Sequence, residues 1–291
     1  ELGKVISEEI KDDNALATYY LSMGFIHNSI GEIPKAIHFY HKSLEIAERI
    51  KDLNGVANAF QNLAAIYADQ GDEEKAIDYG KRSLKTYKKI GDLRGTAYAL
   101  NSVGSYYFTK GEPTKAIDYY NESLKMRIQL GDKYAISDSY NNIGQYYSKI
   151  GNQERALEYF YKALDIHNQI EYNEVAVVLN NIGSIELDKG NLSAAEKMGL
   201  RGLKASQDMG IVNNIKNNAS LLSKVYVLKS DYKNALSMFK LAIEMRDSIN
   251  NDNNQKEAIK QQAKYEYEKH KVLDDAAHDQ QLAIEQEAKE K

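Results

Sequence analysis

The side chains of this chain that could do chemistry are few and scattered. Two of its six histidines, His38 and His41, lie three positions apart, so a helix would place both on one face, where they could share a metal ion. The sequence fixes no third ligand near them, and a solvated pair is the simpler interpretation. Cysteine is absent, which excludes disulfides, zinc–thiolate sites and thiol nucleophiles. We therefore predict no metal site and no cofactor.

The sequence patterns of enzyme active sites are also missing. There is no GxxxxGK[ST] phosphate loop, no GxGxxG after a strand and no HExxH pair. Aspartate and glutamate fall mainly at predicted helix starts and outer faces, where capping and solvation explain them. No nucleophile stands beside a base, so we predict no catalytic residues and a protein that is not an enzyme.

Composition and charge narrow the class of partner. The chain has 38 basic and 42 acidic residues and a formal net charge of −4, so no basic excess favours nucleic acid. Its longest aliphatic run, Val175–Leu179, is far shorter than the roughly 20 residues of a membrane span. With 43 % apolar residues the chain should fold. Any membrane contact is expected to come only through a segment outside this sequence.

One polar pattern is not explained by solvation alone. Asparagine is a mediocre helix former, yet amide side chains recur in the middle of segments with helical periodicity. An amide both donates and accepts hydrogen bonds, which suits the backbone of an extended peptide. Alternatively, these amides bond one another or the neighbouring backbone. The predicted binding residues are Gln61, Asn62, Asn101, Asn141, Asn142, Gln145, Asn180 and Asn181.

The elements that must position these amides follow a fixed period. Four glycines lie forty residues apart, and each is followed five residues later by an alanine. The period continues in altered form through Gly190–Ala195 and Ser230–Ala235. A constant period over most of a chain predicts one supersecondary unit stacked on copies of itself. The four glycines are Gly31, Gly71, Gly111 and Gly151.

One unit, residues 57–92, shows what is repeated. Apolar residues from Phe60 to Tyr67 recur at i, i+3, i+4 and i+7, as on one face of a helix. Gly71 is placed to end that helix in the left-handed conformation, and Asp72 is placed to cap the next one. A second apolar stripe then runs to Ile90 before Gly91 ends it. The unit is therefore predicted to be helix, turn, helix, turn, in an all-α protein.

The slots of this unit resemble the tetratricopeptide repeat family. Tyr140-x-x-Ile143-Gly144-x-x-Tyr147 agrees with the family pattern, as do the alanine and the aromatic residue that follow at 156 and 160. The resemblance implies a right-handed α-solenoid of about six units between residues 15 and 252. Two features depart from the family: no proline closes the second helix, and the period is forty rather than about 34. The fifth unit matches the family pattern least well, because Glu186 and Gly199 stand where aromatic residues are expected.

The resemblance also implies a function. In this family the first helices line a concave groove that holds proteins or peptides, and asparagines at matching positions contact the peptide. The cations that clamp a terminal carboxylate in chaperone-binding relatives are not matched, so a C-terminal carboxylate ligand is disfavoured. One of the corresponding slots is occupied by Asn58, Tyr98, Asp138 and Val177. We expect a non-enzymatic module that binds a partner segment in the groove.

The two ends of the chain differ from the repeats. Ile6, Ile10 and Lys11 lie forty residues before matching residues, so residues 1–14 are predicted to be the second helix of an earlier unit, and the parent protein is expected to continue upstream. A polar break at residues 250–254 precedes a stretch without glycine or proline. Residues 253–291 are therefore predicted to be a linker and a charged helix with a thin apolar stripe. Residues 255–291 could pair in a homodimer or dock in the groove.

The segments at residues 245–249 and 261–269 resemble a junction in repeat-bearing signalling proteins of the Bacteroidetes type. There, a tetratricopeptide array leads through a charged helix into a membrane span and an output domain such as a nucleotide cyclase or a histidine kinase. The resemblance implies that this chain is the input region of a receptor, on the periplasmic side of a membrane. The alternative is a structural scaffold or dimerisation module of a soluble cytoplasmic regulator.

Overall fold

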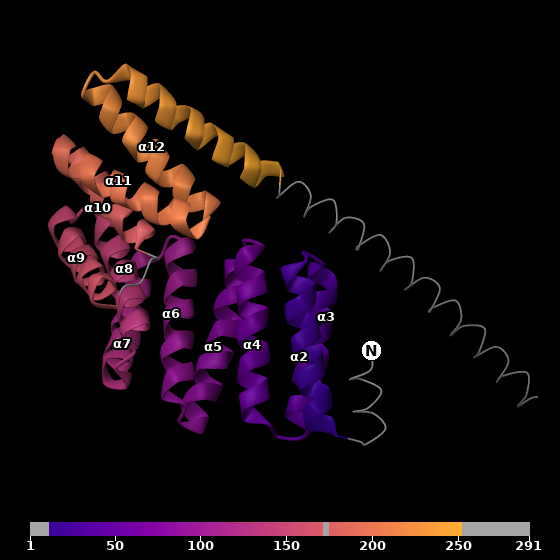
Figure 1. Ribbon diagram of the computed structural model, residues 1–291. Coiled ribbons are helices and arrows are strands. Elements are labelled where there is room, and N and C mark those ends of the chain that lie inside the picture. The colour runs from indigo at the N-terminus through magenta and orange to yellow at the C-terminus, as the bar shows by residue number, and fades with distance from the viewer. Residues whose placement is uncertain (1–11, 171–174, 252–291) are drawn as a thin grey trace, which may run out of the picture. The chain divides into compact units, whose positions relative to one another are not determined.

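A computed structural model describes residues 12–170 and 175–251, and every regular element in these ranges is a helix (Figure 1). The chain divides into two compact parts, residues 1–50 with 252–291 and residues 51–251. The described residues of the first compact part form one helix pair, α2 (Asp13–Ser29) and α3 (Ile33–Arg49), whose two helices pack on each other. Ser43 Oγ donates a 2.9 Å hydrogen bond to the Ala17 carbonyl across this pair.

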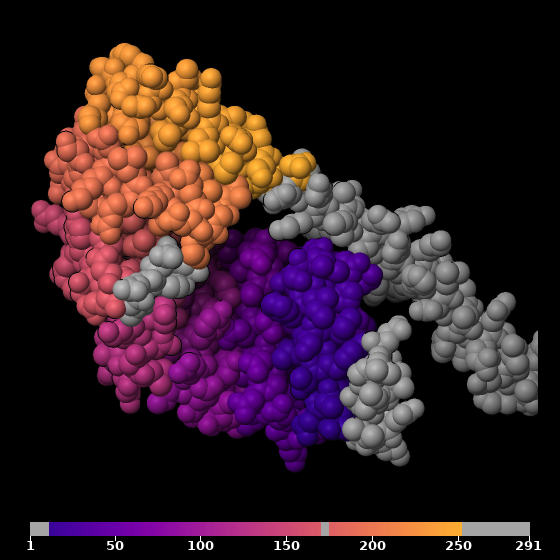
Figure 2. Space-filling view, in the orientation of Figure 1, coloured from indigo at the N-terminus to yellow at the C-terminus, as the bar shows by residue number. Residues whose placement is uncertain are grey.

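The second compact part, residues 51–251, contains the remaining helices. The first helices of its pairs are α4, α6, α8, α10 and α12, and each is followed by a second helix after a short turn. Successive helices pack on one another along the chain, and Figure 2 shows the surface that they form, coloured by residue number. The bounds are α4 (Leu53–Asp69), α5 (Glu73–Ile90), α6 (Leu93–Thr109), α7 (Pro113–Leu130), α8 (Lys133–Lys149), α9 (Gln153–Ile170), α10 (Ala176–Asp188), α11 (Leu192–Met209), α12 (Val212–Leu228) and a helix over residues 232–251.

The turns between helices form as the glycine period predicts. Gly71 has a φ of 73° and Gly151 a φ of 81°, in the left-handed region that a side chain disfavours. Asp72 caps α5 by accepting a hydrogen bond from the Lys75 backbone N–H. In the altered sixth unit, Ser230 occupies the glycine position and still adopts a φ of 59°. The turn geometry therefore persists where the glycine does not.

Close approach between paired helices explains the small residues of the repeat. An added Cβ on Gly144 would lie 2.5 Å from the Phe160 ring, and one on Gly104 would lie 2.8 Å from the Tyr120 ring. From α5 to α11, each second helix also packs on the next first helix, as α5 does on α6 and α7 on α8. This succession of packed pairs confirms the predicted all-α repeat fold.

A serine hydroxyl joins the two helices of several pairs. Ser83 Oγ donates a 2.9 Å hydrogen bond to the Ala57 carbonyl, and Ser123 Oγ a 2.7 Å bond to the Ala97 carbonyl. In the next pair alanine replaces the serine, and the bond runs the other way, from Ser137 Oγ to the Ala163 carbonyl at 3.2 Å. The buried hydroxyl is thus satisfied whichever helix carries it.

Several predictions about the chain ends lie outside the described residues. These concern the helix at residues 1–11 and the helix and possible homodimer at residues 255–291. The helix over residues 232–251 includes Asn250 and Asn251, the first two residues of the polar stretch. The division into residues 1–14, 15–252 and 253–291 stays a prediction.

Candidate functional site

The eight predicted binding residues all lie on first helices. Gln61 and Asn62 come from α4, Asn101 from α6, and Asn180 and Asn181 from α10. The other three, Asn141, Asn142 and Gln145, come from α8. All eight are half-buried, as expected for side chains that flank the apolar stripe instead of joining it.

Four of these asparagines bond one another across successive first helices. Asn142 Nδ2 donates to Asn101 Oδ1 at 3.0 Å, which joins α8 to α6. Asn181 Nδ2 donates to Asn141 Oδ1, also at 3.0 Å, which joins α10 to α8. We call Asn101, Asn141, Asn142 and Asn181 the amide ladder. Each amide has two N–H groups and an oxygen with two lone pairs, so each keeps hydrogen-bonding capacity beyond these bonds.

The remaining predicted residues are not part of the ladder. Gln61 Oε1 accepts a 3.4 Å hydrogen bond from Ser83 Oγ on the second helix of its own pair. Asn180 Nδ2 is buried and has no hydrogen-bond partner among the described residues. Gln145 makes no hydrogen bond within that part of the structure, but it lines a pocket next to the ladder. The sequence identified the amides but not these differences among them.

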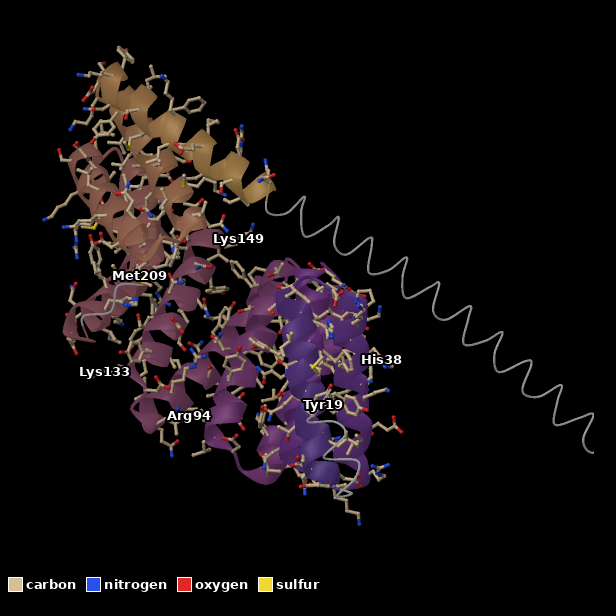
Figure 3. All side chains as sticks on the ribbon, turned by 45° about the vertical axis from the view of Figure 1, so that its right-hand side comes forward. Tyr19, His38, Arg94, Lys133, Lys149 and Met209 are labelled. Carbon is tan, nitrogen blue, oxygen red and sulfur yellow. The ribbon has the colours of Figure 1, made fainter. Side chains whose placement is uncertain are left out.

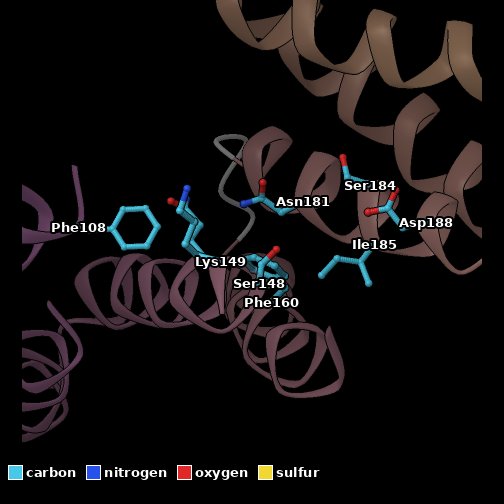
Figure 4. A pocket seen from close by; sticks show the side chains of 9 residues that line it. Phe108, Ser148, Lys149, Phe160, Asn181, Ser184, Ile185 and Asp188 are labelled. Atoms are coloured by element: carbon cyan, nitrogen blue, oxygen red, sulfur yellow. The ribbon is translucent and has the colours of Figure 1, made fainter. Parts of the chain in front are cut away.

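That pocket has a volume of about 380 Å³ and lies among α6, α8, α9 and α10. Figure 4 shows Phe108 at one end, Ile185 and Asp188 at the other, and Asn181 between them. We call it the groove pocket. Its lining is mixed, and comprises Phe108, Gln145, Ser148, Lys149, Phe160, Asn181, Ser184, Ile185 and Asp188.

The only buried arginine of the described residues is engaged by the fold. Arg127 is 5 % exposed, and its Nη1 donates to the Ala135 carbonyl at 2.6 Å and to Ser139 Oγ at 3.0 Å. Burial lowers the pKa of this guanidinium, and the neighbouring carboxylates of Asp138 and Asp132 act in the opposite direction. Arg127 lies on α7 and donates these hydrogen bonds to α8, so it joins two repeats and is not placed to clamp a ligand carboxylate.

One repeat position corresponds to a site where chaperone-binding relatives carry a cation that clamps a terminal carboxylate. In this chain that position holds Asn58, Tyr98, Asp138 and Val177, none of which is a cation. Asn58 Oδ1 accepts a 2.6 Å hydrogen bond from the Tyr87 hydroxyl, and Tyr98 is 58 % exposed. Tyr106 lies on the same helix, α6, as Tyr98, and burial raises its pKa to about 12. It therefore stays a neutral hydroxyl at physiological pH.

Sequence reasoning missed a recurring aromatic stack between the two helices of a pair. Tyr67 stacks on Tyr79 with ring centroids 5.5 Å apart, and Lys75 Nζ lies 4.9 Å from the centroid of the Tyr67 ring. The pairs Tyr107–Tyr119 and Tyr147–Tyr159 repeat the stack, with Lys115 and Arg155 as the cations. The forty-residue recurrence of these tyrosines and cations was the available signal.

The fifth unit replaces this stack by a polar contact. Glu186, at the slot where tyrosine was expected, is 8 % exposed and accepts a 2.7 Å hydrogen bond from Asn191 Nδ2. The carboxylate therefore has a partner in the turn that follows α10. The weak match of this unit to the repeat pattern corresponds to a real local difference in packing.

The two histidines that could have shared a metal are exposed on α3, where Figure 3 labels His38. Partial desolvation of its ring, with Lys42 and His41 nearby, lowers the pKa of His38. Within residues 12–170 and 175–251, no three histidine, aspartate or glutamate side chains gather as metal ligands. No helix in the same ranges combines the length and apolar character needed to cross a membrane.

The sequence pattern of the tetratricopeptide repeat family matches residues 14–89 and 95–169, which together make up just over half of the chain. No curated protein matches the sequence.

Solved structures share the fold. BtubC from P. vanneervenii superimposes with a TM-score of 0.64 at 21 % identity, over 74 % of this chain and 91 % of that one. A second similar structure is the Pyrococcus horikoshii signal transduction ATPase with numerous domains, which has a tetratricopeptide repeat sensor. It superimposes with a TM-score of 0.68 at 22 % identity, over 85 % of this chain and 39 % of that one. A Rap protein complexed with competence and sporulation factor gives 0.62 at 15 % identity, over 81 % and 76 %. At these identities the likeness concerns the fold alone.

Proposed function

Because this chain belongs to the tetratricopeptide repeat family, whose helix pairs are protein-interaction modules, we propose that it binds an extended segment of a partner protein along α6, α8 and α10. One observation carries this proposal: Gln145 and Asn181, predicted as binding residues from sequence, line the same pocket beside the amide ladder. The Gln145 amide makes no hydrogen bond to a described residue, so both its N–H groups and its oxygen are available to a ligand.

The ladder gives the segment a fixed polar track. The bonds from Asn142 to Asn101 and from Asn181 to Asn141 hold the four side chains in defined orientations before a ligand arrives. A preorganised amide loses less side-chain freedom on binding than a mobile one, and its remaining N–H and lone pair can bond a peptide backbone. The amide–amide bonds are therefore compatible with binding, and the ligand adds bonds without breaking them.

We further propose that the array is the sensory input region of a signalling receptor. Support comes from the junction-like segments near the end of the chain and from a neighbour, the Pyrococcus horikoshii protein, that has a tetratricopeptide repeat sensor. A segment bound across successive first helices would stiffen the stack, and the helix over residues 232–251 would carry that change onward. This role places the array outside the cytoplasm, and a cytoplasmic regulator is the alternative location.

A second candidate function is a scaffold that pairs with a second copy through the end of the array. Leu236 and Phe239 on the helix over residues 232–251 are 53 % and 55 % exposed, more than large apolar side chains favour. Light scattering of the 291-residue chain and of a Phe239→Asp variant tests it. A dimer that the substitution dissociates would support the scaffold, and a monomer in both cases would contradict it.

Peptide selection tests the main proposal. Peptides from a random display library are selected on the whole chain, and the affinity of each enriched peptide is then measured by fluorescence anisotropy. A triple variant, Asn142→Ala, Gln145→Ala and Asn181→Ala, should bind them about tenfold more weakly or worse, because several backbone hydrogen bonds are lost together. The matched control, Asn121→Ala with Gln129→Ala, removes exposed amides of the second helix α7 and should bind normally. Undiminished binding by the triple variant would contradict the groove assignment.

A further inference from the structure

The groove pocket has an apolar floor and end. Phe160 and Ile185 are buried, and Phe108 is half-buried at the α6 side of the pocket (Figure 4). A volume of about 380 Å³ accommodates a large side chain together with the backbone on either side of it. An apolar side chain laid against Phe108 would remove both surfaces from water.

Two charged side chains of opposite sign complete the pocket. Lys149 is the last residue of α8 and Asp188 the last residue of α10, and they occupy equivalent positions in successive repeats. Both are exposed, and neither forms an ion pair with any described residue, including the other. Figure 3 also labels Lys149 at the end of its helix. The pocket therefore presents one uncompensated cation and one uncompensated anion.

The helix ends strengthen this polarity at Asp188. The C-terminus of a helix carries a partial negative charge from its unpaired carbonyl groups. In α10 no basic residue lies in the last turn, so Asp188 adds its charge to that of the helix end. Lys189, the capping residue, is exposed and does not line the pocket. A cation brought to Asp188 would gain from the carboxylate and from the helix end together.

We propose that the groove pocket selects a partner segment with three features in spatial order from α6 to α10. An apolar side chain lies against Phe108, an acidic side chain reaches Lys149, and a basic side chain reaches Asp188. This inference rests on the proposed function, since it assumes that the segment lies along these first helices. The occupant is thus a protein segment of mixed charge with a large apolar anchor, and not a uniformly acidic or basic one.

Charge reversal tests this selectivity with the same peptide library and the whole chain. Peptides selected on the original chain should carry the apolar, acidic and basic residues in that order. Lys149→Glu and Asp188→Lys should each lower the affinity for these peptides roughly fivefold. Selections on the double variant should return peptides with the acidic and basic positions exchanged. Both residues are exposed, so both variants should stay folded. The melting temperature should fall slightly for Lys149→Glu and rise slightly for Asp188→Lys, because each changes the charge at a helix C-terminus. The control, Lys189→Glu, should return the original preference.

The possible outcomes distinguish failure of the charge selectivity from failure of the proposed binding function. If enriched peptides lose affinity for the triple alanine variant but bind both charge-reversed variants as before, the charge selectivity is overturned and the groove assignment stands. If no enriched peptide distinguishes the triple alanine variant from the original chain, the proposed function is overturned and the selectivity with it. Preference for the reversed charges by the double variant supports both.

Discussion

Asn142 Nδ2 donates a 3.0 Å hydrogen bond to Asn101 Oδ1, and these two side chains belong to the first helices of successive repeats. The bond links α8 directly to α6, in addition to the contacts that each makes with the second helix between them. The equivalent bond from Asn181 to Asn141 continues the link to α10. A polar connection therefore runs along the face that we propose as the binding groove.

The first prediction concerns that bond. Asn101→Ala and Asn142→Ala should each destabilise the array, and their effects should couple by about 1 kcal/mol, because removing either partner already removes the bond. The measurement is a double-mutant cycle from denaturant unfolding followed by circular dichroism, analysed for an array of coupled repeats. Asn142→Ala paired with Asn121→Ala, whose side chain is exposed on α7, should show no coupling. Additive effects of the bonded pair would contradict the prediction.

The second prediction concerns the close contact at Gly144. Gly144→Ala should destabilise the chain by about 1–3 kcal/mol, because the added methyl group would lie 2.5 Å from the buried Phe160 ring. The midpoint of thermal unfolding measures the loss. Adding Phe160→Leu should restore part of it by moving side-chain atoms away from the new methyl group. A Gly144→Ala variant as stable as the original chain would show that the two helices separate at little cost.

The third prediction concerns the left-handed turn at Ser230. Ser230→Gly should stabilise the sixth unit by about 0.5–1 kcal/mol, because glycine adopts a φ of 59° without the steric cost that serine bears. Hydrogen exchange of the flanking helices measures the local stability. The reverse change, Gly151→Ser, should have the opposite effect, since Gly151 has a φ of 81° and an added Cβ there would meet no other atom within 4 Å. Equal exchange in all three chains would exclude turn strain.

The fourth prediction is a pH dependence in the first helix pair. Burial raises the pKa of Glu32, but hydrogen bonds from Lys35 and His27 outweigh it, so the folded pKa lies below its ordinary value of 4.5. A depressed carboxyl pKa contributes stability that is present above the unfolded pKa and is lost as pH falls through the folded one. Glu32→Gln should therefore lower the melting temperature most at neutral pH.

The measurement for this prediction is a series of melts between about pH 6 and pH 3, compared between variants. The gap between Glu32→Gln and the original chain should narrow as the pH falls below 4.5. Glu154→Gln, a change at an exposed residue without an ion pair among those described, should follow the original chain throughout. A gap that does not change with pH would assign the Glu32 effect to packing.

The sequence was sufficient for the helices and turns because these depend on local requirements. A left-handed φ favours glycine wherever it stands, and Asp72 caps α5 with its own neighbours as partners. The amides of the candidate site were also identifiable, since asparagine is unexpected in a helix interior. Which amides bond, by contrast, was not predictable. Asn142 reaches Asn101, forty-one residues earlier, whereas Asn181 reaches Asn141, forty residues earlier.

By itself, the sequence determined a repeated helix pair and a row of polar side chains on its first helices. Only the tertiary structure decided that Phe108, Lys149 and Asp188, from three different helices, line one pocket. The physical reason is that periodicity fixes which face of a helix is buried, whereas the displacement between neighbouring helices depends on packing. Contacts such as Phe160 against Gly144 set that displacement, and with it the side chains that meet in the groove.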